Sequence, residues 1–292
     1  TSYVDADVSG TADKVGGFFG ELGAHVYPVE IVRSFAKGSV TGAEQVGGMV
    51  GLGASLGSFD ITYSFVASDV EGTDKVGGLV GYVRSDLTLT DVLAYGSVRA
   101  TIEGPADVGG LVGASDLINF YVTNSYWDSD TTGQSTSVDA QALGLTTEEL
   151  QCPTEAADLL CATSVYYGWD NDLWDFGSTT EYPTLYVDGV AARDSDDDDV
   201  WDFYDAFPDD NAASVDDDND GFPDEWNDSC DSECQNASDL TLDDDPTEPF
   251  VEEEEEEQPV DVDAGNGSDE TDSGNSTATK KKKSGSFGLL IF

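Results

Sequence analysis

Aspartate residues recur at fixed spacing in two stretches of the C-terminal half of the chain. In the first stretch they occupy positions 1, 3, 5, 9 and 12 of a twelve-residue ladder. The second ladder begins at Asp216, with aspartates at positions 1, 3, 5 and 9 and an asparagine at position 12. With the residue at position 7 included, the first set is Asp194, Asp196, Asp198, Val200, Asp202 and Asp205, and the second is Asp216, Asp218, Asp220, Phe222, Asp224 and Asn227.

This spacing suits a hard cation. Alternate side chains of a tight loop converge on one centre, the backbone carbonyl at position 7 adds an oxygen, and about six to eight oxygens satisfy calcium. Magnesium fits less well because it requires a strict octahedral shell. We therefore expect Ca²⁺ as the bound ion. The alternative is a solvated acidic linker, but Phe-Pro and Gly-Phe-Pro at matching points of two phased ladders favour metal binding.

The ladders differ from an EF-hand, which has flanking amphipathic helices and a glutamate at position 12. The alternation at Asp205–Asp210 (DAFPDD), followed by the second ladder, resembles thrombospondin type 3 repeats and their bacterial counterparts. That resemblance implies a segment in which calcium ions take the place of a hydrophobic core. Two positions depart from the pattern, because Asp199 replaces glycine at position 6 of the first ladder and Asn227 replaces aspartate at position 12 of the second. Asp239, Asp243 and Asp245 are interpreted as a degraded third copy.

The charge of the chain restricts its partners. There are 61 acidic residues against 11 Lys and Arg, a net charge of −50, and no Lys or Arg occurs between Asp194 and Thr279. This stretch cannot neutralise itself with ion pairs, so it requires cations or stays expanded. The same charge excludes nucleic acid, whose phosphates it repels, and disfavours anionic lipid surfaces.

The four cysteines form two local pairs, Cys152 with Cys161 and Cys230 with Cys234. Such spacing predicts short-range disulfides in an oxidising compartment. A four-cysteine zinc site is the competing interpretation, but the two spacings do not both match zinc motifs, and the single histidine, His25, is remote. We therefore expect an extracellular protein.

Glycine-rich blocks repeat along the first half of the chain. VGGFFG, VGGMVG, VGGLVG and VGGLVG begin at Val15, Val46, Val76 and Val108, so the blocks are almost evenly spaced. The paired glycines allow sharp corners or close backbone approach, and the flanking apolar residues supply a buried stripe. Stacked copies bury a column that no single copy could bury alone. The pattern predicts an all-β, right-handed β-helix or β-solenoid, with a β-sandwich as the alternative.

These blocks resemble the GLUG-motif repeats of bacterial secreted and surface proteins over residues 1–135. The stretches at Asn124–Ser137, Gly144–Leu150 and Trp174–Tyr186 resemble the module that closes such arrays, which we assign to residues 136–190. A solenoid needs a cap to protect its last open edge. The predicted cap is Trp169, Trp174, Phe176, Tyr182 and Tyr186, for which a sugar-stacking platform is the alternative role.

Residues 191–247 then form the thrombospondin type 3-like segment, and residues 248–292 a disordered acidic linker. The linker ends in four lysines and Phe287–Phe292 (FGLLIF). This apolar run is far shorter than the roughly 20 apolar residues of a spanning helix. We interpret it as the start of a truncated sorting or anchoring tail, with a tag-like or random end as the alternative. No signal peptide is visible, so we expect a fragment or a mature form.

The resemblances imply a calcium-binding protein of the bacterial cell surface, with adhesion to a polysaccharide or protein ligand. The alternative is a non-catalytic part of a secreted polysaccharide- or peptide-degrading enzyme with a catalytic domain upstream. We expect no catalysis in this chain, because it has no HExxH or GxSxG motif and one histidine. Asp128 and Asp130 offer a carboxylate pair for glycosidic chemistry, but we interpret them as surface turn formers.

Overall fold

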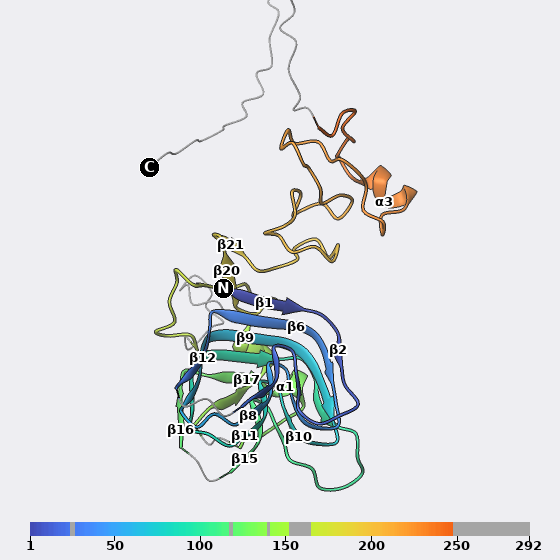
Figure 1. Cartoon of the computed structure of the whole chain (residues 1–292). Coiled ribbons are helices and arrows are strands. Elements are labelled where there is room, and N and C mark those ends of the chain that lie inside the picture. Colours follow the sequence, from blue (N-terminus) through green and yellow to red (C-terminus); the bar gives the residue numbers. More distant parts are fainter. Residues whose placement is uncertain (24–26, 117–118, 139–140, 152–164, 248–292) are drawn as a thin grey trace, which may run out of the picture. The chain divides into compact units, whose positions relative to one another are not determined.

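Parallel strands stack in successive turns of a β-solenoid in the computed structural model, as Figure 1 shows. The structure describes residues 1–23, 27–116, 119–138, 141–151 and 165–247. The prediction of an all-β solenoid is confirmed. His25, the Cys152–Cys161 pair and the predicted linker and anchor at 248–292 lie outside the described residues.

Each turn contributes strands to three parallel sheets. The long sheet runs in the order β1 (Ser2–Asp5), β6 (Ser34–Thr41), β9 (Phe59–Gly72), β12 (Leu87–Tyr95), β17 (Tyr126–Asp128) and β18 (Leu143–Leu145), joined by β2 (Val8–Ser9), β5 (Val29–Val32), β13 (Val98–Ala100) and β16 (Phe120–Thr123). The second sheet contains β3 (Val15–Gly16), β7 (Glu44–Gly47), β10 (Asp74–Gly77) and β14 (Val108–Gly109). The third contains β4 (Phe19–Leu22), β8 (Val50–Gly53), β11 (Val80–Val83) and β15 (Val112–Ser115).

The register of these sheets converts the sequence repeat into columns of like residues. In the second sheet Val46 pairs with both Val15 and Val76, and Val76 pairs in turn with Val108. Every pairing within the three sheets is parallel, whereas a β-sandwich consists of antiparallel strands. The four strands of the second and third sheets therefore correspond to four turns of solenoid.

The paired glycines lie where the second sheet turns into the third. A Cβ atom at Gly77 would lie 2.1 Å from the carbonyl oxygen of Val80 and 2.7 Å from the amide nitrogen of Gly113. Both neighbours are backbone atoms, which cannot move aside independently of the fold. The glycines thus permit close approach of one turn to the next.

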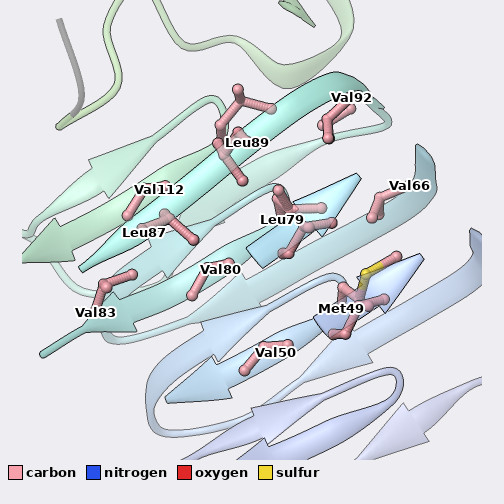
Figure 2. Close-up of a cluster of buried hydrophobic side chains, with 14 of the residues drawn as sticks. Met49, Val50, Val66, Leu79, Val80, Val83, Leu87, Leu89, Val92 and Val112 are labelled. Carbon is pink, nitrogen blue, oxygen red and sulfur yellow. The ribbon is translucent and has the colours of Figure 1, made fainter. Parts of the chain in front are cut away.

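The interior between the sheets is filled by aliphatic side chains, as Figure 2 shows for Met49, Leu79 and their neighbours. Met49, Leu79 and Leu111 follow one another in successive turns and are fully buried. Each such side chain contributes roughly 1.5–3 kcal/mol when it is removed from water. The apolar residue inside each glycine block therefore forms the core column that the repeat predicted.

Side chains alternate between the two faces of the long sheet. Ala36 and Val66 lie on the interior side of the sheet. Phe35 and Phe65, which precede them in the sequence, belong to a second buried cluster on the outer face. Four aromatic residues and one leucine of this cluster are paired from turn to turn, and we name them the outer aromatic row: Tyr3, Phe35, Phe65, Leu93 and Tyr126. The rings of Phe35 and Phe65 stack with centroids 4.8 Å apart.

The predicted aromatic cap packs against this outer row and not on the last edge of the solenoid. Trp174 contacts Phe65 at a ring-centroid distance of 6.2 Å, and Trp169 contacts Tyr126 at 6.3 Å. Three short antiparallel strands carry part of this module: β19 (Trp174–Asp175), β20 (Thr184–Val187) and β21 (Val190–Ala191). The prediction assigned these aromatic side chains to the open edge, whereas they bury the rings on the outer face of the long sheet.

The last turn is instead closed by Trp127 and β18. A Cβ atom at Gly110 would lie 2.2 Å from Cδ1 of Trp127, so the indole covers the end of the glycine column. Its Nε1 donates a hydrogen bond to the carbonyl oxygen of Gln134 at 2.8 Å. Trp127 lies in the stretch Asn124–Ser137, for which a closing role was predicted.

Candidate metal centre

The two aspartate ladders fold into two loops with the same hydrogen bonds. In the first loop, the amide of Asp198 donates to Asp194 at 3.1 Å and to Asp196 at 3.3 Å. In the second, the amide of Asp220 donates to Asp216 and Asp218, both at 3.2 Å. Three further bonds repeat at equivalent ladder positions: Asp199, Val200 and Ser195 donate to Asp194, Asp198 and Asp202, and Gly221, Phe222 and Asp217 donate to Asp216, Asp220 and Asp224.

The backbone of the loops turns through left-handed residues at equivalent positions. Asp197 and Asn219 have φ angles of 61° at position 4. At position 6, Asp199 has φ 72° and Gly221 has φ 90°. The departure from glycine in the first loop is therefore accommodated, because aspartate tolerates the left-handed region better than most residues.

The carboxylates at positions 1, 3 and 5 converge in each loop. One oxygen atom from each of Asp194, Asp196 and Asp198 lies within 4.8 Å of the other two. The same holds for the second loop, with Asp216, Asp218 and Asp220. Three converging carboxylate oxygens are a suitable start for a calcium shell.

Positions 7 and 9 hold the loops closed. The amides of Val200 and Phe222 donate to the carboxylates at position 5, at 2.7 and 2.9 Å. Asp202 accepts from the amide of Ser195 at 2.8 Å and from its hydroxyl at 2.7 Å, and Asp224 accepts from the amide of Asp217 at 3.1 Å. Both position-9 carboxylates thus link the end of a ladder to its start.

Asp205, at position 12 of the first loop, is a buried carboxylate. One oxygen accepts a hydrogen bond from the amide of Phe207 at 2.7 Å, while Oδ2 is buried without a partner. Burial, together with the charges of Asp198 and Asp196, raises the pKa of Asp205 to about 6, against the hydrogen bond from the amide of Phe207, which lowers it. The buried carboxylate of Asp205 therefore lies close enough to the carboxylates of its own loop to be repelled by them.

Asn227 was predicted to complete the second loop, but the structure places it against the first. Its Nδ2 donates to Oδ2 of Asp198 at 2.6 Å, and its Oδ1 accepts from the hydroxyl of Ser214 at 2.8 Å. The backbone explains this position, because the amide of Asn227 donates to the carbonyl oxygen of Ala212 at 2.8 Å. The chain therefore leaves the second loop after position 9.

Asp243, and not Asn227, lies beside the second loop. Its amide donates to the carbonyl oxygen of Pro223 at 2.9 Å, its Oδ2 is buried without a partner, and its charge contributes to raising the pKa of Asp218. The first cause of that rise in pKa is desolvation, followed by the charge of Asp220. Asp243 was assigned to a third copy because sequence spacing alone cannot show a side chain returning from a later segment.

The buried carboxylate oxygens test whether these residues fit a cation. Within the described ranges, ten buried side-chain atoms lack a hydrogen-bond partner, and half of them belong to this acidic segment. They are oxygens of Asp196, Asp205, Asp218, Asp224 and Asp243. Buried anionic oxygens without donors are costly unless a cation compensates them. The donor set, all oxygen, therefore fits a hard divalent ion.

Cys230 and Cys234 lie within disulfide range, with their Cα atoms 5.3 Å apart. Cys234 belongs to α3 (Ser232–Ala237), whose N-cap is Asp231. Ser238, which follows this helix, donates its hydroxyl to Asp210 at 2.7 Å. The pair therefore restrains the turn between the second loop and Asp243, as its predicted role in stapling that turn requires.

The acid pair weighed for glycosidic chemistry has a structural role. Asp128 is fully buried, not on the surface as predicted, and forms the N-cap of α1 (Ser129–Thr132). One oxygen accepts from the amides of Asp130 and Thr131, and the other from the hydroxyls of Thr147, the first residue of α2 (Thr147–Leu150), and Tyr182. Its hydrogen-bonding capacity is therefore used within the fold.

Comparisons with protein-family models, with curated proteins and with solved structures found no match. Among the residues that the structure describes, no helix is both long and apolar enough to cross a bilayer.

Proposed function

We propose that the two aspartate loops bind Ca²⁺ and that the chain is a calcium-binding protein of the extracellular bacterial surface. In the first loop, Asp194, Asp196 and Asp198 would hold the ion together with Asp205. In the second, Asp216, Asp218 and Asp220 would do so together with Asp243. Bound calcium stiffens the segment that carries the solenoid.

One observation carries this proposal. The same five hydrogen bonds recur in both loops, and in both they turn carboxylates toward a common centre where buried oxygens lack donors. A solvated acidic linker would gain nothing from this arrangement, because carboxylates in water repel one another and separate. The shared geometry therefore supports a shared ligand.

The outer surface of the solenoid supports a role in binding, with a cell-surface polysaccharide or protein as the partner. Its repeats build a rigid scaffold, and repeat proteins use such extended surfaces for recognition. The adhesive role, the bacterial surface location and the kinship to GLUG-motif and thrombospondin type 3 repeats belong to the same proposal. They rest on the repeated blocks and ladders of the sequence.

Calorimetric titration of the full chain with CaCl₂, and in parallel with MgCl₂, tests the metal. We expect two calcium-binding events. The double variant Asp194→Asn/Asp196→Asn should remove one event, and the position-matched Asp216→Asn/Asp218→Asn should remove the other. Asp172→Asn, an exposed acid outside both loops, serves as the control. The absence of calcium uptake at millimolar concentration would refute the proposal.

A further inference from the structure

The outer aromatic row of the solenoid requires cover along its whole length. Trp174 and Trp169 of the closing module contact Phe65 and Tyr126, in the later turns. The earliest members of the row are Tyr3 in β1 and Phe35 in β6, whose rings stack at 5.2 Å. These two rings are covered by a different part of the chain.

The cover comes from three side chains of the first aspartate loop, Trp201, Phe203 and Tyr204, which we name the clasp. Trp201 packs on Phe35 with ring centroids 5.4 Å apart. Phe203 and Tyr204 contact Tyr3 at 5.5 and 6.3 Å. Trp201 is 9% exposed and Phe35 is fully buried, so this contact excludes water from the row.

Polar contacts fix the clasp on the first two turns. The indole Nε1 of Trp201 donates to Oδ2 of Asp5 in β1 at 2.8 Å. The hydroxyl of Tyr3 donates to that of Tyr204 at 2.6 Å. The ammonium of Lys37 in β6 lies 4.6 Å from the centre of the Trp201 ring, a favourable cation–π contact. The clasp is therefore oriented as well as buried.

The clasp and the ion ligands alternate along one short segment. Val200, Asp202 and Asp205 are positions 7, 9 and 12 of the ladder, and clasp residues fill positions 8, 10 and 11 between them. The ladder side of this segment carries a buried anionic oxygen without a donor, because Asp205 is 9% exposed and its Oδ2 has no partner in the described structure. One stretch of backbone thus faces the ion centre and the solenoid at once.

We infer that the first loop is a calcium-dependent clasp that closes the outer aromatic row over the first two turns of the solenoid. The inference rests on the proposed calcium binding and adds to it a task for one loop only. Calcium neutralises the carboxylates that would otherwise force the loop open, and the closed loop holds Trp201, Phe203 and Tyr204 on Tyr3 and Phe35. Release of calcium uncovers those rings.

The second loop supplies a natural control. Its positions 8, 10 and 11 are Pro223, Glu225 and Trp226, so the aromatic triplet of the first loop is not repeated. The ion-facing hydrogen bonds are nevertheless the same in both loops. Calcium at the second loop should therefore leave the solenoid unchanged.

Coupling of this kind is reciprocal. If calcium stabilises the closed clasp, the docked clasp raises the affinity of the first loop for calcium by the same factor. Removal of Trp201 leaves all the carboxylates in place, but it takes away the contact that organises them. We expect Trp201→Ala to weaken calcium binding at the first loop about tenfold, while Trp226→Ala leaves both affinities unchanged.

Hydrogen exchange of the full chain, measured by mass spectrometry with CaCl₂ and with chelator, tests the clasp. Calcium should slow exchange of the β1 amides at Ser2–Asp5 at least tenfold in the parent protein. The slowing should disappear in Asp194→Asn/Asp196→Asn and in Trp201→Ala. The slowing should persist in Asp216→Asn/Asp218→Asn and in Trp226→Ala. Exchange of the amides in the later turns, measured in the same experiment, shows whether each variant retains its fold.

The outcomes separate the two proposals. If calorimetry shows no calcium uptake by the first loop, calcium binding and the clasp are both wrong. If uptake is normal and exchange of β1 is the same with and without calcium, only the clasp is wrong. Equal loss of protection in the variants of the two loops also overturns it, because the effect then arises from charge in general.

Discussion

The solenoid and the acidic segment both repeat, but different forces hold their repeats together. The solenoid stacks its copies through an apolar interior, with Met49, Leu79 and Leu111 fully buried. In the described acidic segment after Arg193, the buried apolar residues are few: Trp201, Ala212, Ala213, Pro223 and Cys230. Its copies are instead organised by carboxylates that accept from backbone amides.

A repeat in the sequence therefore does not by itself show which interaction holds its copies together in the fold. A column of valines gains free energy from burial in any solution that keeps the hydrophobic effect strong. A ring of aspartates becomes favourable only when cations are supplied. The two regions should therefore respond to different perturbations, and four experiments test this difference.

The largest effect is expected from Gly77→Ala. The added methyl group would meet backbone atoms of Val80 and Gly113, so the turns must separate. We expect a loss of about 3 kcal/mol or more in the free energy of unfolding, equal with calcium and with chelator. Denaturant unfolding measures it, and Gly23→Ala is the control because nothing lies within 4 Å of a Cβ there. A loss that depends on calcium would contradict the separation of forces.

Removal of calcium should have the next largest effect, confined to the acidic segment and the clasp. With calcium at about 100 times its dissociation constant, binding to the native state contributes about 2.7 kcal/mol per site. Chelation should therefore expose residues 194–247 to proteases while the solenoid between β6 and β17 stays resistant. Limited proteolysis with mass spectrometry measures this difference. Identical fragments with and without chelator would count against a metal-held segment.

Replacement of Asp91 by asparagine should have a smaller effect that depends on pH. Burial raises the pKa of Asp91 from 3.8 to about 6, against a hydrogen bond from Asn124 that lowers it. Because the folded state holds the proton more tightly, the carboxyl destabilises the solenoid progressively as pH rises from about 4 through about 6. We expect Asp91→Asn to raise the free energy of unfolding at pH 7 by about 1–2 kcal/mol and to have little effect near pH 4.

Denaturant unfolding in chelator at both pH values measures the effect of Asp91→Asn. The exposed Asp172→Asn is the matched control. A gain that is the same at pH 4 and pH 7 would show that the charge of Asp91 is not its cause.

The smallest effect is expected at the surface ion pair of Arg99 and Glu71. The side chain of Arg99 is mostly exposed, so water and salt screen the pair. Arg99→Ala should lower the free energy of unfolding by about 0.5 kcal/mol or less, and the loss should shrink further at high salt. A loss of several kcal/mol would show that charge pairing also stabilises the solenoid, and that the two regions do not differ in this respect.

Much of the fold could be predicted because its signals are periodic. The blocks at Val15, Val46, Val76 and Val108 fix the length of a turn, and the structure pairs those valines directly. Spacing also predicted that the carboxylates at positions 1, 3 and 5 of each ladder lie together, and they converge in both loops. Local repetition of this kind is visible in the sequence because each copy is built from adjacent residues.

Contacts between distant segments could not be predicted. Asp243 returns to the second loop, and Asn227 turns to the first, through backbone hydrogen bonds that no spacing encodes. The aromatic residues of the closing module were recognised, but the face that they cover depends on which rings of the long sheet point outward. The role of Trp201 could not be predicted for the same reason, because its hydrogen-bond partner Asp5 lies at the other end of the described chain.

The register described for Val46 and Val76 makes the length of the protein adjustable in whole steps. One turn of the solenoid separates these two valines, and both neighbours of each are again valines. Duplication of residues 44–73 would therefore continue the valine column of the second sheet and lengthen the stack by about 4.8 Å. A gene that duplicates such a unit would change the reach of its product by one step and would add one ring, a second Phe65, to the part of the outer row that the clasp and the closing module must cover.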